Sequence, residues 1–174
     1  MRLPKDAEAQ CQRLLSEFRR NIPADEIYQQ RLAEEMEIIL SLRFVEYFLR
    51  IREILDMTVD LPHMTRGSAG SSLVCWALGI TDVDPIEWDI PLSRFLNPHR
   101  DDLPDVDIDF PHWAQTQVMQ VLATVSALSS KSKRHQKLAQ LKLTDAFFQQ
   151  QSSAKLQTSA LECLTTTKFY LLCG

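Results

Sequence analysis

The sequence lacks any apolar run that approaches the roughly 20 residues of a membrane-spanning helix, and its opening residues, MRLPKDAEAQ, lack the apolar centre of a secretory signal. Its four cysteines show no CxxC spacing, and its four histidines are scattered along the chain. This distribution excludes the usual zinc-binding patterns and favours reduced thiols. We therefore expect a cytoplasmic protein that has no partner in a membrane.

Two common phosphate-binding patterns are also missing, because the chain has neither GxxxxGK[ST] nor GxGxxG. It has instead a connector, LPHMTRGSAGSS, whose small residues run into an apolar segment, residues 73–78, ended by Gly79. The first N–H groups of a helix have no partner within it and carry partial positive charge. If a helix begins here, Gly67 and Ser68 are candidate phosphate ligands, although an ordinary capped helix start has the same sequence pattern.

The charge of the chain is spread unevenly. Residues 1–118 hold 12 basic and 21 acidic residues, a net charge of −9, whereas residues 119–174 hold seven basic and two acidic residues, a net charge of +5. The second segment is also rich in Ser, Thr, Gln and Lys and contains no Pro. We therefore expect a change of character near residue 119, where either a basic helical appendage or a segment foreign to the domain begins.

Apolar residues recur every three or four positions from residue 24 to residue 60, which predicts two amphipathic helices with a bend near Ser41. Residues 6–20 show a similar pattern, and we expect Asn21 and Pro23 to end that helix. Apolar stripes of this kind usually form a core, so we interpret these helices as scaffold.

The stretch LPDVDIDFPHW, residues 103–113, places Asp105, Asp107 and Asp109 on alternate positions. On a β-strand all three carboxylates would point to one face and the apolar residues between them to the other. Carboxylates this close repel one another unless a cation lies between them, and Mg²⁺ is held in proteins by one or two carboxylates together with water and phosphate oxygens. The pattern thus predicts a metal site, with an acidic edge strand as the alternative.

The two motifs lie close together in the sequence and are joined by GITDVDP and RFLNP. The whole run RGSAGSSLVCWALGITDVDPIEWDIPLSRFLNPHRDDLPDVDIDF closely resembles the palm region of the C-family bacterial replicative DNA polymerases, the DNA polymerase III alpha subunits. The preceding RLAEEMEIILSLRFVEYFLRIREIL resembles the helical lead-in to that palm. The resemblance covers residues 25–113.

The resemblance implies an α+β fold. A helical lead-in is expected over residues 1–60, an incomplete nucleotidyltransferase-type (polymerase beta-like) palm over residues 61–118, and an unmatched basic tail over residues 119–174.

The resemblance also implies the site residues. Asp105 and Asp107 correspond to the paired catalytic aspartates that bind two Mg²⁺ ions in the family. Gly67 and Ser68, with the neighbouring Arg66, correspond to the motif that holds the triphosphate of the incoming deoxynucleotide. The partners implied are primer–template DNA, deoxynucleoside triphosphates and replisome subunits.

Three further residues have supporting or alternative roles. Asp109 is expected to support the catalytic pair, and Arg94 and Arg100 are expected either to neutralise phosphate charge or to pair with nearby acids.

The departures from the family are large, because no match to its downstream third carboxylate follows Trp113. We therefore expect a fragment of a DNA polymerase, from a truncated or frameshifted gene. Two alternatives remain open. One is a non-enzymatic helical interaction protein with a basic nucleic-acid-binding tail, and the other is a compact nucleotidyltransferase that uses Asp109 or Asp145 as its third carboxylate.

The purified chain alone is expected to show no primer extension above background, since two aspartates do not position two ions, a primer and a template. The measurement is incorporation of labelled deoxynucleotide into a primer–template with Mg²⁺. Incorporation that is abolished by Asp105→Ala would contradict this expectation and favour the compact nucleotidyltransferase.

Overall fold

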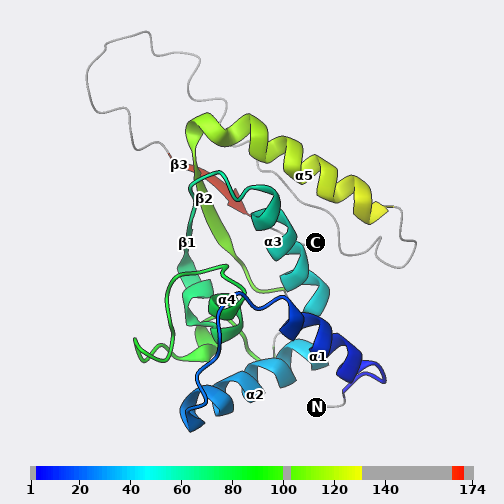
Figure 1. Cartoon of the computed structure of the whole chain (residues 1–174), viewed down its shortest axis with the longest axis vertical. Helices are drawn as coiled ribbons and strands as arrows, with labels where there is room; N and C mark the ends of the chain where they lie inside the picture. The colour runs from blue at the N-terminus through cyan, green and yellow to red at the C-terminus, as the bar shows by residue number, and fades with distance from the viewer. Residues whose placement is uncertain (1–2, 100–102, 131–165, 171–174) are drawn as a thin grey trace.

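The structure is a computed structural model that describes residues 3–99, 103–130 and 166–170. Within these residues it combines helices with a small antiparallel sheet, which confirms the α+β class. Figure 1 shows α1 (Ala7–Ser16) and α2 (Glu26–Ser41) at one end of the molecule and α5 (Gln115–Ser130) at the other, with α3 (Val45–Met57) running between them. None of the described helices is long and apolar enough to cross a membrane.

In chain order the elements are α1 (Ala7–Ser16), α2 (Glu26–Ser41), α3 (Val45–Met57), β1 (Met64–Arg66), the 3₁₀ helix η1 (Gly67–Ser71), α4 (Leu73–Ala77), η2 (Leu92–Arg94), β2 (Asp107–Pro111), η3 (His112–Ala114), α5 (Gln115–Ser130) and β3 (Thr166–Tyr170).

The sheet has the strand order β1-β2-β3, and both of its pairings are antiparallel. Arg66 of β1 lies opposite Asp107 of β2. On the other side of β2, Asp107 lies opposite Tyr170 and Asp109 lies opposite Lys168. The acidic strand is therefore the central strand of the described sheet, and the alternative of an acidic edge strand is wrong.

The N-terminal helices follow their predicted order. Because α2 ends at Ser41 and α3 begins at Val45, the predicted pair of helices with a bend near Ser41 is confirmed. The helix predicted over residues 6–20 is shorter and ends at Ser16. The chain leaves this helix early because the N–H groups of Arg19 and Arg20 donate to the Ala77 carbonyl oxygen, at 2.7 and 3.0 Å.

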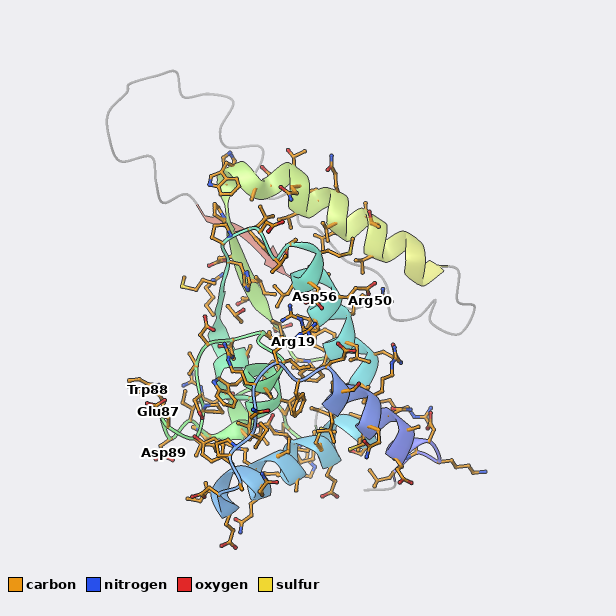
Figure 2. The ribbon with its side chains drawn as sticks, viewed as in Figure 1. Arg19, Arg50, Asp56, Glu87, Trp88 and Asp89 are labelled. Carbon is orange, nitrogen blue, oxygen red and sulfur yellow. The ribbon has the colours of Figure 1, made fainter. Side chains whose placement is uncertain are left out.

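Two arginines fix this N-terminal segment to the rest of the fold. Arg20 Nη1 donates to the carbonyl oxygens of Trp76 and Thr81, at 2.7 and 2.6 Å, and its guanidinium carbon lies 5.5 Å from the centroid of the Trp76 ring. Arg19 Nη2 lies 3.1 Å from Asp56 Oδ2 on α3, and both residues are labelled in Figure 2. Residues that precede α2 are thus bound to both α3 and the end of α4.

Helix α4 ends at a glycine, as the sequence predicts. Gly79 has a φ of +69°, the left-handed region that favours glycine. The Ile80 N–H donates to the Cys75 carbonyl oxygen at 2.8 Å, and the Gly79 N–H donates to that of Trp76 at 3.0 Å. This pair of bonds is the Schellman pattern, which satisfies the last carbonyl groups of the helix.

The core extends from α2 and α3 to β2 and α5. Helix α5 packs against α3, and it runs across the predicted boundary between residues 118 and 119. Val121, Leu122 and Val125, which lie beyond that boundary, are buried with Val118 in the same core. The division into residues 1–60, 61–118 and 119–174 stays a prediction.

Replacing Ile39 by Ala is expected to lower the free energy of unfolding by about 2–5 kcal/mol, because the side chain is fully buried (0% exposed) and its loss leaves a cavity. Ile27 lies on the same helix and is 62% exposed, so Ile27→Ala is the matched control, with a change within about 0.5 kcal/mol. Urea denaturation measures both. Equal effects of the two substitutions would contradict the placement of the α2 core face.

Candidate functional site

The pairing of β1 with β2 brings together the two motifs that the sequence singles out. Arg66 lies opposite Asp107, and Gly67 follows directly in the chain. A Cβ atom built on Gly67 would lie 3.2 Å from Asp107 Oδ2, and the φ of Gly67 is +76°. Glycine is therefore the residue that this position accepts without strain, and its backbone lies directly beside the carboxylate of Asp107.

The small residues form a 3₁₀ turn and not the first turn of an α-helix. Gly67 and Ser68 begin η1, and the Ser71 hydroxyl donates to the Ser68 carbonyl oxygen at 2.6 Å. Ser72 then adopts an extended conformation and caps α4, because its hydroxyl oxygen accepts from the Cys75 N–H at 3.1 Å. The sequence-based expectation of one helix beginning at Gly67 and Ser68 is corrected to a turn followed by a separately capped helix.

The three aspartates occupy three different environments. Asp105 is exposed and precedes β2, Asp107 is partly exposed at the first position of the strand, and Asp109 is buried. Only Asp107 and Asp109 therefore lie within the strand, whereas the sequence predicted all three on it.

Asp109 is bound to a basic residue of the neighbouring strand. Arg66 Nε donates to Asp109 Oδ2 at 2.6 Å. This ion pair supplies the positive charge that a buried carboxylate requires. It engages Asp109, which the sequence offered as a third metal ligand, and it also engages Arg66, which the resemblance placed near the nucleotide. Arg94 is exposed on η2, and Arg100 and Asp145 lie outside the described residues.

The carboxylates available for a metal are Asp105 and Asp107. The described residues contain no group of three or more His, Cys, Asp or Glu side chains placed to hold a metal ion. Mg²⁺ is commonly bound through one or two carboxylates together with substrate phosphates and water. The carboxylate oxygens of Asp105 and Asp107 are of the kind that Mg²⁺ takes as ligands, and oxygen atoms of a nucleotide would have to complete its coordination.

Glu35 on α2 is a residue of this region that the sequence analysis did not identify. Its side chain is fully buried. Oε1 accepts from the Leu73 N–H at 2.7 Å, and Oε2 accepts from the Ser72 hydroxyl at 2.7 Å and the Val74 N–H at 3.0 Å. Burial raises the pKa of Glu35 from 4.5 to about 7, although these hydrogen bonds and the nearby Arg31 oppose the rise.

Comparison with known proteins identifies the family. Residues 3–146 match the family model described as the bacterial DNA polymerase III alpha NTPase domain. The match covers more than half of the chain, and it extends beyond both ends of the resemblance over residues 25–113. The family model thus describes a domain of bacterial DNA polymerases. The chain belongs to the DNA polymerase III alpha family.

Curated relatives agree with this family. The DNA polymerase III subunit alpha of Bacillus subtilis (strain 168) is 42% identical over 99 residues, which cover 55% of this chain and 9% of the relative. The protein of that name from Mycobacterium tuberculosis is 36% identical over 141 residues, 68% of this chain and 12% of the relative. The error-prone DNA polymerase of Bdellovibrio bacteriovorus is 39% identical over 93 residues, 52% of this chain and 9% of the relative. The chain therefore spans about a tenth of the length of these relatives.

Replacing Glu35 by Gln is expected to change how stability depends on pH. Because the folded-state pKa of about 7 lies above the ordinary 4.5, the native chain keeps a proton that the unfolded chain has released. The stabilisation from this proton is complete below about pH 4.5 and is lost as the pH rises through about 7. Relative to Glu35→Gln, the wild-type free energy of unfolding should fall by about 1 kcal/mol per pH unit in this interval.

Urea denaturation at a series of pH values measures this difference. Glu34 is the adjacent, exposed acid on the same helix, so Glu34→Gln is the matched control and should keep the wild-type slope. A Glu35→Gln variant with the same slope as the wild type would contradict the assignment of this titration to Glu35.

Proposed function

We propose that this chain forms part of the nucleotide-binding palm of a DNA-directed DNA polymerase. The observation that carries the proposal is the position of Gly67, where an added Cβ atom would lie 3.2 Å from Asp107 Oδ2. A turn with backbone and hydroxyl donors thus lies beside a partly exposed carboxylate. Nucleotidyl transfer needs phosphate-binding donors and metal-binding acids at one place, and membership of the DNA polymerase III alpha family supports this assignment.

Each residue has a separate role in this proposal. The backbone of Gly67 and the hydroxyl of Ser68 receive the triphosphate of an incoming deoxynucleotide, with Arg66 beside them. Asp105 and Asp107 would hold Mg²⁺, which when bound lowers the pKa of the primer 3′-hydroxyl and neutralises charge on the phosphates. The pairing of Asp109 with Arg66 holds β1 against β2 and so keeps the turn beside Asp107.

This chain corresponds to a short part of its relatives. Because it spans about a tenth of them, we propose that addition of deoxynucleotides to a primer 3′ end needs further groups, including the third carboxylate that the resemblance implies. The proposed partners are primer–template DNA, deoxynucleoside triphosphates and replisome subunits, and the proposed location is the cytoplasm. The basic nucleic-acid-binding tail of the alternative interpretation falls largely on residues 131–165, outside the described part of the chain.

The test is titration of the purified chain with Mg²⁺ and deoxyadenosine triphosphate, followed by NMR of the Gly67, Ser68 and Asp107 backbone amides. We expect saturable shifts at all three that strengthen when nucleotide and metal are present together. Asp107→Asn should weaken the metal-dependent binding by about tenfold or more, since a contact to a charged group contributes about 1.5–3 kcal/mol.

Two matched controls separate the site from general effects. Asp60 is an exposed aspartate that belongs to neither the Gly67–Ser71 turn nor β2, and Asp60→Asn should leave binding unchanged. Gly67→Ala should weaken binding because of its positive φ, whereas a Cβ on Gly70 would meet Val83 at an ordinary 3.6 Å, so Gly70→Ala should bind as the wild type does. Small uniform shifts across the chain, or equal losses in each variant and its control, would overturn the proposed site.

A further inference from the structure

Glu35 connects the helical scaffold to the segment that follows the Gly67–Ser71 turn. The residue lies on α2, and its carboxylate receives the Ser72 hydroxyl together with the N–H groups of Leu73 and Val74. All three donors belong to the first residues of α4 or its cap. One buried side chain thus fixes the point where the turn ends and α4 begins.

Hydrogen bonds continue from this point into the turn. The Ser72 N–H donates to the Ala69 carbonyl oxygen at 3.1 Å, so the residue that Glu35 holds also closes the 3₁₀ turn. The neighbouring Ser71 hydroxyl donates to the Ser68 carbonyl oxygen at 2.6 Å. These hydrogen bonds, together with the peptide bonds between neighbouring residues of the turn, therefore connect the Glu35 carboxylate to the backbone of Ser68.

We propose that Glu35 is a positioning residue for the Gly67–Ser71 turn, and that its ionised form holds the turn in the geometry that receives a nucleotide. The second half of this statement rests on the function proposed for the turn. The first half concerns only the conformation of this chain and is testable without a ligand.

The charged and titratable groups that surround the Glu35 carboxylate are Arg31 and Cys75, and of this cluster Glu35 is the group that titrates near neutral pH. Arg31 Nε lies 4.0 Å from Glu35 Oε1, and the guanidinium also donates to the Ile90 carbonyl oxygen. On α4, the buried Cys75 lies in the same cluster, and burial raises the pKa of its thiol, which stays neutral in this range. The pKa of Glu35 itself is raised to about 7 by burial.

Protonation changes what Glu35 can accept. An ionised carboxylate accepts through both oxygens, whereas a neutral carboxyl group carries a proton on one of them. The three converging donors match the ionised form. Protonation therefore weakens the hold on Ser72 and, through it, on the turn that ends there.

The experiment follows two NMR signals in the wild-type chain as the pH is raised: the carboxyl carbon of Glu35, and the backbone amide of Ser68. We expect the Ser68 amide to shift with the same midpoint as the Glu35 carboxyl. Glu35→Gln should abolish the Ser68 transition, and the exposed Glu34→Gln should leave it unchanged. A Ser68 amide that stays constant while Glu35 titrates would overturn the proposal, and this measurement needs no variant.

A second arm measures nucleotide binding with Mg²⁺ and deoxyadenosine triphosphate over the same pH range. If binding requires ionised Glu35, the apparent affinity one pH unit below the Glu35 midpoint should be about tenfold weaker. The triphosphate also titrates in this range, so the pH dependence of binding is compared between two variants. Glu34→Gln should keep the tenfold weakening below the Glu35 midpoint, and Glu35→Gln should lose it. Equal pH dependence in the two variants would overturn the role in binding.

The two arms separate the two possible failures. If no nucleotide binds at any pH, the proposed function of the turn fails, whereas the Ser68 titration still decides whether Glu35 positions it. If nucleotide binds but Ser68 and Glu35 titrate independently, the positioning role fails and the proposed function stands.

Discussion

The antiparallel pairing of β1 with β2 is the interaction on which the candidate site depends. Strand β1 contains only three residues, so its alignment rests on few backbone hydrogen bonds. The ion pair between Arg66 and Asp109 adds a side-chain contact between the same two strands. Ile108 and Phe110 are buried in the core and anchor β2 itself. With both strands fixed in this way, the backbone of Gly67 meets the carboxylate of Asp107.

Features with a local physical cause could be predicted from the sequence. Apolar residues at helical spacing identified α2, α3 and the break between them, because a helix must bury one face. Gly79 marked the end of α4, because the left-handed conformation there favours glycine. The alternation of aspartates identified β2, although its first position is Asp107 and Asp105 precedes it.

Features that depend on distant contacts could not be predicted. The three residues of β1 carry no strand periodicity of their own, and they become a strand because β2 pairs with them. Glu35 did leave a signal, since it lies three residues after Leu32 and four before Ile39, on the apolar stripe of α2. An acid at such a position requires hydrogen-bond donors, but the sequence did not show that Ser72 and its neighbours would supply them.

The contacts that complete the site also determine when it can form. Arg66 and Asp109 are 43 residues apart, and Glu35 and Ser72 are 37 residues apart. Loops of this length lose conformational entropy before their closing contacts stabilise them, whereas α2 and α3 form from bonds between near neighbours. We therefore expect the scaffold helices to form before the site does. During synthesis neither motif meets the other until the ribosome has released Asp109.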